Sequence, residues 1–389
     1  MKREIKRRRL GRTNLWVTEL SFGAMNLRIM NTVDEAEQLL HFVLGQGINL
    51  VDTARAYKGH NDEGALVESE VLVGKAIRNH PHLSEPIVIV TKGHGYTLED
   101  LEADLFTSRG KLGIEGQGDL KIGDKDIKLV YFFHGINKDR WTTMLKSGVL
   151  DRIQELKKDG YINHIGFSSH YHDTEEIMAA TDTGIFEVVE LPYNVFNRSL
   201  SEDNPVNIFE YLYKKDIGIV NMKAFSGNSM PPIYNILKEY ISIDYPAMLD
   251  FCLCNPYITT VDAGATSIRQ MEMNIETACR ERMSPEKLSL LIQEADKVAP
   301  SMRDVCRECM HCLEKFSCPQ EVDFPGILSI YSRYTISKRL GKETSAFSEQ
   351  YKEKKYDMQE CIECGECLPW CEYKLNIPEM IKEAREAFL

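Results

Sequence analysis

Two runs of cysteine residues in the last quarter of the chain constrain its possible structure more than any other feature. The first run contains Cys306, Cys309, Cys312 and Cys318, and the second contains Cys361, Cys364, Cys367 and Cys371. Each run reads C-x2-C-x2-C with a fourth cysteine a few residues later. This spacing is typical of ligands to 4Fe-4S clusters, because three closely spaced thiolates surround one cluster and the distant fourth reaches the other.

The pattern therefore predicts two 4Fe-4S clusters with crossed ligation. The expected ligands are Cys306, Cys309, Cys312 and Cys371 for the first cluster, and Cys361, Cys364, Cys367 and Cys318 for the second. Zinc is a weaker alternative, because zinc ribbons use pairs of cysteines rather than triplets. A disulfide framework would suit a small secreted chain rather than one of 389 residues.

The overall composition limits the classes of function. The chain has 389 residues, 43% of them hydrophobic, which is enough for two or three domains or for one barrel with an appendage. A net charge of −12 argues against non-specific binding to nucleic acid or to an anionic membrane. The basic residues 1–10 precede no apolar stretch, so we expect the polar face of a strand there and no signal peptide.

No stretch approaches the roughly 20 apolar residues that a membrane span needs, so membrane insertion is not expected. Iron–sulfur clusters need a reducing compartment. We therefore expect a cytoplasmic protein of an anaerobic organism.

The first part of the chain alternates short β-rich runs with helical stretches, which is the rhythm of parallel βα units. Eight candidate strands begin at Glu19, Ile48, Pro86, Ile127, Ile162, Phe186, Ile217 and Ile258. Most lack clean alternation of polar and apolar residues, as strands buried on both faces should. They predict an α/β fold of the (β/α)8 TIM-barrel type, preceded by a hairpin that turns at residues 11–14. A doubly wound sheet is the alternative, but no G-x-G-x-x-G follows the first strand.

We expect two domains, a barrel over residues 1–283 and a small, largely helical iron–sulfur domain over residues 284–389. Helical patterns lie at 285–298, before the first cysteine run, and at 324–356, between the runs. This long spacer resembles that of the helical two-cluster ferredoxin modules fused to larger oxidoreductases. The polar segments 58–68 and 110–126 predict surface loops. The remaining cysteines, expected to act as small buried hydrophobes, are Cys252, Cys254 and Cys279.

The predicted strand ends carry a set of residues suited to proton transfer, and these ends hold the functional groups of such barrels. The residues are Asp52, Tyr57, Lys92 and His134. A tyrosine with a pKa near 10 is a poor acid at neutral pH, but a nearby ammonium lowers that pKa and a carboxylate keeps the ammonium charged. A histidine can orient a carbonyl oxygen. The set predicts protonation of a carbonyl oxygen as hydride reaches its carbon, or the reverse reaction.

The chain resembles the aldo/keto reductase family over about Leu10–Arg282. The resemblance rests on the motifs NLVDTARAY, VIVTK, FFHGI, GFSSH, LPYN, MK and GATS, which follow successive strands. It implies that Tyr57 is the general acid and base, that Lys92 and Asp52 tune it, and that His134 orients a small carbonyl or alcohol substrate. It also implies that NAD(P)H lies across the mouth of the barrel.

The resemblance assigns a further set of residues to this cofactor. They are Ser168, Ser169, Glu190, Tyr193, Lys223, Gly264, Thr266, Gln270 and Asn274. Two of them depart from the family pattern, because position 169 is usually Asn and position 190 is commonly Gln. Arg269 is the basic residue of the GATSIRQ loop, and a 2′-phosphate needs such cations. NADP, NAD and loss of the nucleotide therefore all stay open at this point.

A nicotinamide transfers two electrons as hydride, whereas each cluster transfers one. Three interpretations follow. The barrel is a working reductase whose clusters exchange electrons with a bound flavin or with a redox protein such as a ferredoxin. Alternatively, the chain is an electron-transfer relay on a barrel that no longer uses nicotinamide. In the third interpretation the clusters are structural or sensory. His170 fits either a pocket residue or a helix cap equally well.

Overall fold

The computed structural model describes residues 4–61, 64–83, 85–170, 174–201, 204–227, 230–308, 312–313, 316–371 and 373–388. The chain divides into two compact units. The first unit comprises Met1–Asn194, Arg198–Ala224 and Pro246–Met283. The second comprises Val195–Asn197, Phe225–Tyr245 and Ser284–Leu389.

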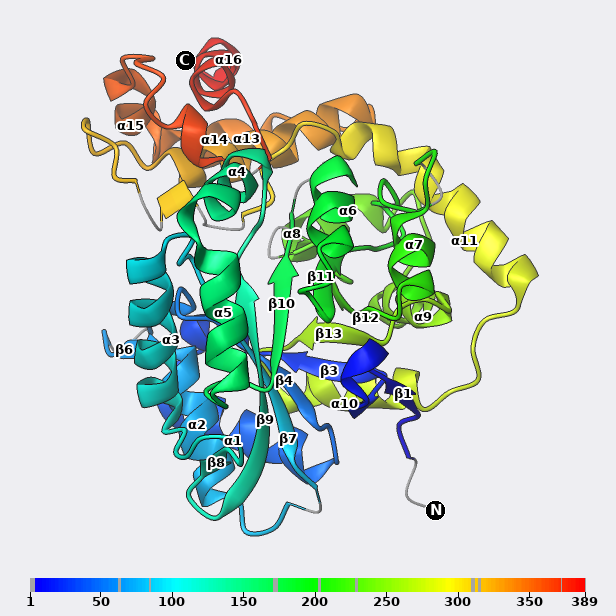
Figure 1. Cartoon of the computed structure of the whole chain (residues 1–389). Helices are drawn as coiled ribbons and strands as arrows, with labels where there is room; N and C mark the ends of the chain where they lie inside the picture. The colour runs from blue at the N-terminus through cyan, green and yellow to red at the C-terminus, as the bar shows by residue number, and fades with distance from the viewer. Residues whose placement is uncertain are drawn as a thin grey trace. The chain divides into compact units, whose positions relative to one another are not determined.

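The first unit is a closed barrel of eight parallel strands (Figure 1). The strands are β3 (Leu20–Gly23), β4 (Leu50–Asp52), β7 (Ile87–Gly93), β9 (Lys125–Phe133), β10 (His164–Ser168), β11 (Val188–Pro192), β12 (Gly218–Met222) and β13 (Thr260–Gly264). Strand β13 pairs with β3, and β9 pairs with β10, so the sheet closes on itself. The predicted barrel is confirmed, and each of the eight predicted strand segments overlaps with one of these strands.

The inside of the barrel is filled by apolar side chains from alternate positions of the strands. Leu50, Val88, Val130, Val188 and Val220 belong to one fully buried cluster. Successive side chains of a strand point to opposite faces, so the residue two positions after an inward residue also points inward. In strands β4, β7 and β11, the side chains that point into the barrel are therefore apolar in the middle layer and polar at the C-terminal ends.

Helices lie outside these strands, as expected for βα units (Figure 1). They are α1 (Val33–Gly45), α2 (Ser69–Asn79), α3 (Leu98–Leu112), α4 (Lys138–Ser147), α5 (Val149–Lys158), α6 (Thr174–Asp182), α7 (Ile208–Lys214), α9 (Tyr245–Cys254) and α10 (Ile268–Ala278). Several begin at a side chain that accepts a backbone N–H, for example Thr32 before α1 and Asn137 before α4. Such caps satisfy N–H groups that have no partner within the helix.

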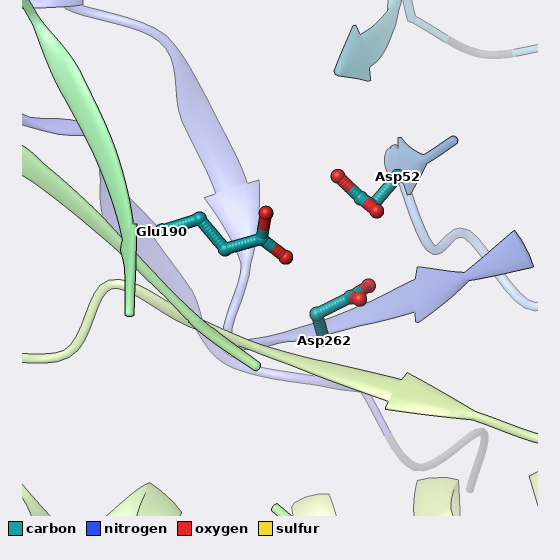
Figure 2. Close-up of side chains that lie close together, drawn as sticks. All are labelled: Asp52, Glu190 and Asp262. Carbon is teal, nitrogen blue, oxygen red and sulfur yellow. The ribbon is translucent and has the colours of Figure 1, made fainter. Parts of the chain in front are cut away.

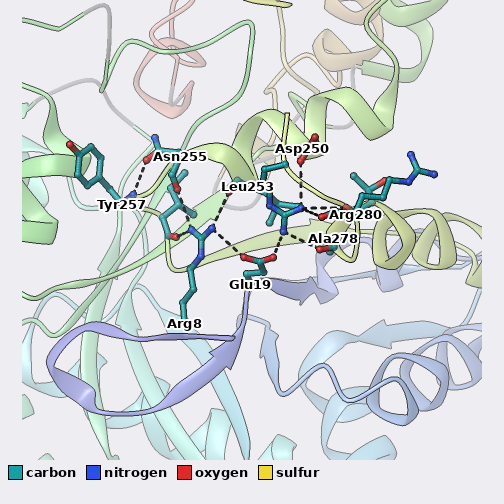
Figure 3. Close-up of polar contacts among 11 residues, drawn as sticks. Arg8, Glu19, Asp250, Leu253, Asn255, Tyr257, Ala278 and Arg280 are labelled. Carbon is teal, nitrogen blue, oxygen red and sulfur yellow. Dashed lines mark hydrogen bonds and ion pairs between the residues drawn. The ribbon is translucent and has the colours of Figure 1, made fainter. Parts of the chain in front are cut away.

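The N-terminal hairpin is present as predicted, with β1 (Arg7–Arg9) antiparallel to β2 (Trp16–Thr18). Its basic residues are used at the base of the barrel (Figure 3). Arg8 donates hydrogen bonds to the backbone oxygens of Leu253 at 3.1 Å and Asn255 at 3.2 Å, and forms an ion pair with Glu19 at 3.2 Å. Glu19 also pairs with Arg282, so a buried carboxylate lies between two guanidinium groups.

The two segments predicted as surface loops contain regular structure, so this prediction was wrong in part. Strands β5 (Lys58–His60) and β6 (Leu66–Glu68) pair within the first segment. In the second, α3 continues to Leu112, and β8 (Lys121–Ile122) pairs with the start of β9. A polar, glycine-rich composition indicates exposed residues and tight turns. It does not exclude strands, because exposed backbone can still form hydrogen bonds across a short hairpin.

The described part of the second unit is helical. Its α-helices are α8 (Met230–Leu237), α11 (Pro285–Val298), α13 (Phe324–Arg339), α14 (Ala346–Lys352), α15 (Lys355–Glu360) and α16 (Ile377–Phe388). The helix expected at 285–298 is α11, and the expected helical spacer contains α13 and α14. The core of the unit includes Ile327, Met358 and Ile381, each at most 1% exposed.

Helix α8 and its flanking residues lie in this second unit, although the sequence places them within the expected barrel domain. Helix α8 packs against α13. Tyr240 donates a hydrogen bond to the backbone oxygen of Leu340 at 3.0 Å, and Lys342 forms an ion pair with Glu239 at 2.8 Å. No local sequence pattern indicates contacts between residues so far apart in the chain. Only the tertiary structure therefore shows that helix α8 belongs to the second unit.

The three isolated cysteines differ in burial. Cys252 is fully buried, as predicted, whereas Cys254 and Cys279 are half-buried. Among the helices that the structure describes, none combines the length and the apolar character that crossing a membrane requires.

Candidate active site

The predicted tetrad converges around the buried ammonium of Lys92, at the C-terminal end of β7. Lys92 Nζ donates to both carboxylate oxygens of Asp52 and to the backbone oxygen of Thr53, the latter at 3.2 Å. The same nitrogen lies 3.4 Å from the hydroxyl oxygen of Tyr57. Asp52 and Lys92 are each 1% exposed, and Tyr57 is 8% exposed. Asp52, Lys92 and Tyr57 thus form one connected set shielded from solvent.

His134 completes the tetrad from the end of β9. Its ring meets the Tyr57 ring edge-on, with centroids 5.9 Å apart and an interplanar angle of 86°. His94, which the sequence analysis missed, stacks on His134 with centroids 4.7 Å apart. His94 follows Lys92 by two residues, and that proximity was the available signal. The centroid of the His170 ring lies 6.4 Å from that of His134, which favours the interpretation of His170 as a pocket residue. Part of the segment that His170 would cap lies outside the described residues.

The surroundings hold Tyr57 and Lys92 in defined protonation states. Burial raises the pKa of Tyr57 far above its ordinary value, although the charge of Lys92 acts in the opposite direction. Burial alone would lower the pKa of Lys92, but Asp52 and Glu190 raise it well above the ordinary value of lysine. Without substrate, Tyr57 is therefore a neutral phenol beside an ammonium, which is the state of a general acid before it donates its proton.

Two further carboxyl groups lie beside the tetrad. Glu190 Oε2, at the end of β11, lies 3.3 Å from Lys92 Nζ. Asp262, on β13, joins Asp52 and Glu190 in a group in which one carboxyl oxygen of each residue lies within 4.8 Å of the others. Figure 2 shows the three carboxyl groups pointing toward one another from three strands. Burial, and then Glu190, raise the pKa of Asp262 to about 8.

Asp262 was absent from the predicted site. Its signal in the sequence is a carboxylate inside the otherwise uncharged strand segment at residues 258–264. Charged residues are rarely placed inside a barrel strand without a partner. Burial, followed by Glu190, raises the pKa of Asp52 well above its usual range, and Asp262 adds to the rise although Lys92 opposes it.

The hydroxyl groups of the two serines assigned to the nicotinamide take part in hydrogen bonds of the barrel. Ser168 Oγ accepts a hydrogen bond from the backbone N–H of Gly135 at 2.9 Å. Ser169 Oγ donates to the backbone oxygen of Ile136 at 3.1 Å. Both side chains are buried at the end of β10, and they stabilise the loop that follows His134.

Tyr193 and Lys223 follow β11 and β12. The Tyr193 ring packs on the rings of Phe251 and Phe209, each at a centroid distance of 5.1 Å. Lys223 adopts a left-handed backbone conformation with φ of 62°. Its charge is close enough to Asp262 to oppose the rise in the pKa of that carboxyl group.

The loop after β13 leads directly into helix α10. Gln270 Oε1 accepts a hydrogen bond from the backbone N–H of Thr266 at 2.8 Å, and Ser267 caps the helix by accepting from Gln270 N. Asn274 lies buried one turn further along α10. The backbone N–H groups and the dipole at a helix N-terminus favour phosphate groups. The approach from Gly264 to α10 therefore fits the predicted phosphate-binding role.

Four of the predicted cluster ligands lie close together in the helical unit. Burial raises the pKa of Cys367 to about 11, and the neighbouring sulfur atoms of Cys361, Cys364 and Cys318 add to the rise. These four are the ligands predicted for the second cluster, including the crossing Cys318. No disulfide joins two of the cysteines that the structure describes.

Both cysteine runs contain the same local backbone feature. Glu308 and Glu363, each directly before the second cysteine of its run, have positive φ angles of 50° and 56°. The backbone N–H of Glu308 donates to Cys306 Sγ at 3.4 Å, as N–H groups do to cluster thiolates. Half-buried thiols from both runs pack against one apolar core, namely Cys306, Cys312, Cys318, Cys361, Cys367 and Cys371. Cys309 lies outside the described residues.

Comparison with known proteins agrees with the barrel. The model of the aldo/keto reductase family matches residues 19–237, which is more than half of the chain. The uncharacterized oxidoreductase YqkF of Bacillus subtilis (strain 168) is 24% identical over 318 residues, which cover 74% of this chain and 95% of that protein. A 6-dehydroglucose reductase of Novosphingobium aromaticivorans is 32% identical over 87 residues, which cover 22% of this chain and 28% of that protein.

A solved structure has the same fold. The holo form of an aldo-keto reductase from Bacillus halodurans superposes with a TM-score of 0.59 and 22% sequence identity, and the match covers 75% of this chain and 96% of that one. Both cysteine runs lie beyond residue 237, outside the region that the family model matches.

Proposed function

Because this chain belongs to the aldo/keto reductase family and is an oxidoreductase, we propose that it reduces the carbonyl group of a small substrate, or oxidises the corresponding alcohol. The observation that supports the proposal best is the buried contact between Lys92 Nζ and the Tyr57 hydroxyl, at 3.4 Å, together with the hydrogen bond from the same ammonium to Asp52. In the reductive direction Tyr57 donates its proton to the carbonyl oxygen.

The neighbours of Tyr57 stabilise the charge that this transfer creates. Loss of the proton leaves a phenolate, and the Lys92 ammonium is positioned to stabilise it. Asp52 keeps Lys92 charged and fixed in place through two hydrogen bonds. The edge-on ring of His134 bounds the space beside the hydroxyl group, where it can orient the carbonyl oxygen. Burial of the whole set excludes water and strengthens these charge interactions.

We propose NAD(P)H as the source of hydride. The capped N-terminus of α10 and the Thr266 loop would hold its phosphates, and Ser168, Ser169, Glu190, Tyr193 and Lys223 stand on the strand ends that the family resemblance assigns to it. Arg269, exposed in the first turn of α10, is the residue available for a 2′-phosphate. The cofactor would supply the hydride, while the chain supplies and recovers the proton.

Replacing Tyr57 tests this proposal. We expect Tyr57→Phe to lower kcat for reduction of a panel of aromatic aldehydes by about 100- to 10,000-fold, because it removes the general acid. Binding of NADPH and NADH, measured by fluorescence, should stay unchanged. Tyr213→Phe is the matched control, because Tyr213 is 57% exposed. Equal activity of the Tyr57→Phe variant and the control would contradict the role of Tyr57.

We further propose that the helical unit binds two 4Fe-4S clusters that exchange single electrons with a redox protein such as a ferredoxin, or with a bound flavin. The convergence of Cys318 with Cys361, Cys364 and Cys367 supports this donor set, because four thiols are what a cubane cluster takes. The repeated left-handed turn before the second cysteine of each run supports equivalent sites. A cytoplasmic, reducing location follows from the chemistry of such clusters.

Iron and sulfide analysis of anaerobically purified protein tests the cluster proposal. We expect about eight iron atoms per chain, and about four after Cys364→Ser or Cys371→Ser. Paramagnetic resonance of the reduced protein should show that Cys371→Ser loses the same cluster as Cys306→Ser, since the ligation is crossed. Cys254→Ser, which changes a half-buried cysteine outside the runs, is the control. Zinc in place of iron in anaerobically purified protein would refute the proposal.

A second candidate function is an electron-transfer relay on a barrel that does not use nicotinamide. The carboxyl groups of Glu190 and Asp262 support it, because they place two acidic side chains in the region expected to receive the nicotinamide. Titration with NADH and NADPH decides between the two functions. Absence of binding of either nucleotide, with both clusters intact, would favour the relay.

A further inference from the structure

We propose that Glu190 and Asp262 share one proton and return it through Lys92 to Tyr57 after each turnover, so that the two residues form a proton reservoir behind the general acid. The proposal rests on the proposed reductase function for its catalytic consequence. The shared proton itself depends only on the arrangement of the carboxyl groups.

The geometry brings the groups of the proposed path close together. Glu190 Oε2 lies 3.3 Å from Lys92 Nζ, and Lys92 Nζ lies 3.4 Å from the Tyr57 hydroxyl. One carboxyl oxygen of Glu190 and one of Asp262 lie within 4.8 Å of each other (Figure 2). The path therefore runs from β13 through β11 and β7 to Tyr57, in the loop that follows β4.

The charges of this region are not balanced. Three carboxyl groups, those of Asp52, Glu190 and Asp262, face one buried ammonium, that of Lys92. Both oxygens of Asp52 are already hydrogen-bonded to Lys92. The positive charge of this ammonium is therefore less able to stabilise negative charge on the other two carboxyl groups. The other groups that face the cluster are Tyr57, neutral and buried, His134 beside Tyr57, and Lys223, which acts on Asp262. Like charges this close in a buried site favour retention of a proton by one of them.

Two oxygen atoms mark where the proton is held. Glu190 Oε2 and Asp262 Oδ1 are both buried, and neither takes part in a hydrogen bond with the residues that the structure describes, although Glu190 Oε2 lies 3.3 Å from Lys92 Nζ. A buried carboxylate oxygen without a hydrogen bond costs free energy, and a proton shared between the two carboxyl groups removes that cost. The pKa of Asp262, raised to about 8 by burial and by Glu190, agrees with a carboxyl group that stays protonated at neutral pH.

Burial also gives the path a direction. Asp262 is partly exposed, whereas Glu190 is 2% exposed and Lys92 is 1% exposed. The reservoir therefore refills from solvent at Asp262. Tyr57 gives its proton to the substrate oxygen, and Lys92 then gives one proton to the resulting phenolate. Lys92 takes a proton from Glu190, and Glu190 takes one from Asp262. Asp262 takes its proton from water, so one proton enters for each proton transferred and no electron moves along this path.

The shared proton can be tested without substrate. We expect carbon-13 NMR of side-chain carboxyl groups in the purified full chain to show one carboxyl group that titrates near pH 8. This signal should disappear in Asp262→Asn and shift to lower pH in Glu190→Gln, because the repulsion between the pair is then removed. Asp126→Asn, at an exposed position, is the control and should leave the signal unchanged. Ionisation of both carboxyl groups at neutral pH in the unmodified chain would overturn the proposal.

Addition of magnesium chloride separates a proton from a metal ion. The signal of the protonated carboxyl group should persist, since the site holds a proton. Its loss on addition of magnesium would show that a divalent cation replaces the proton, and would overturn the proposal.

The relay has its own readout in kinetics. With an active aldehyde substrate, we expect kcat of the unmodified enzyme to fall above about pH 8, as the reservoir loses its proton. In Asp262→Asn, kcat should be about 10-fold lower at neutral pH with this inflection absent and KM unchanged. An unchanged pH profile in this variant would overturn the relay, whereas a complete lack of activity in the unmodified enzyme would refute the proposed function and leave the NMR result standing.

Discussion

The two ends of the barrel treat buried charge in opposite ways. At the base, Arg8 and Arg282 face Glu19 and Asp250, so two positive groups meet two negative groups (Figure 3). At the mouth, three carboxyl groups face Lys92 (Figure 2). Balanced networks hold a structure together, whereas unbalanced ones shift pKa values and mark functional sites. The difference agrees with the general division of these barrels, in which the base serves stability and the mouth serves chemistry.

The largest effect on stability is expected at the base. Glu19→Gln should lower the free energy of unfolding of the barrel by about 3 kcal/mol or more, because it removes the carboxylate that pairs with both Arg8 and Arg282, whereas Asp250 pairs with Arg282. Urea unfolding followed by circular dichroism measures the change. Glu349→Gln, at an exposed helical position, is the control. A decrease in the free energy of unfolding below about 1 kcal/mol would show that removing a charge costs no more stability at the base than at the surface.

An intermediate effect is expected at the mouth, and it depends on pH. The pKa of Asp262 in the folded state, about 8, lies above that of an unfolded aspartate. The folded chain thus binds the proton more tightly, and the contribution of Asp262 to stability decreases as the pH rises from about 4 to about 8. The decrease in the unfolding free energy over this window should be smaller in Asp262→Asn than in the unmodified protein. Parallel stability profiles would contradict this expectation.

The smallest effect is expected for an ion pair on the surface. Arg9 and Asp216 pair at 2.6 Å, but their side chains are 42% and 49% exposed. Water and salt screen such a pair, so Arg9→Ala should change the unfolding free energy by no more than about 1 kcal/mol. The same urea experiment measures it. A loss as large as that of Glu19→Gln would show that the hairpin, rather than the buried network, stabilises the base.

The tetrad was predictable because three of its residues stand at the ends of strands with a strong apolar signal, and Tyr57 lies in the short loop after the first of them. Asp52 and Lys92 end runs of buried residues, and parallel strands bring such ends to one face. Asp262 was not predicted, because nothing near it in the chain indicates which charges it will face. Its neighbour β3 lies more than 230 residues earlier, and only closure of the barrel pairs them.

In the helical unit, too, some features follow from local sequence and others only from tertiary structure. Its cysteine spacing is a local property of the chain, so the sequence alone is enough to predict two sets of cluster ligands, and these sets stay a prediction. The contact between α8 and α13 joins segments about 90 residues apart, and no periodicity in either segment specifies the partner.

The sequence by itself determined the eight strands, the tetrad and the spacing of the cysteines, because these depend on which residues recur at fixed intervals along the chain. Tertiary structure alone decided that Glu190 and Asp262 meet beside Lys92, and that α8 packs in the helical unit. The physical reason is that electrostatic and packing energies depend on distances in space. Closure of the barrel sets those distances between residues that are far apart in the chain.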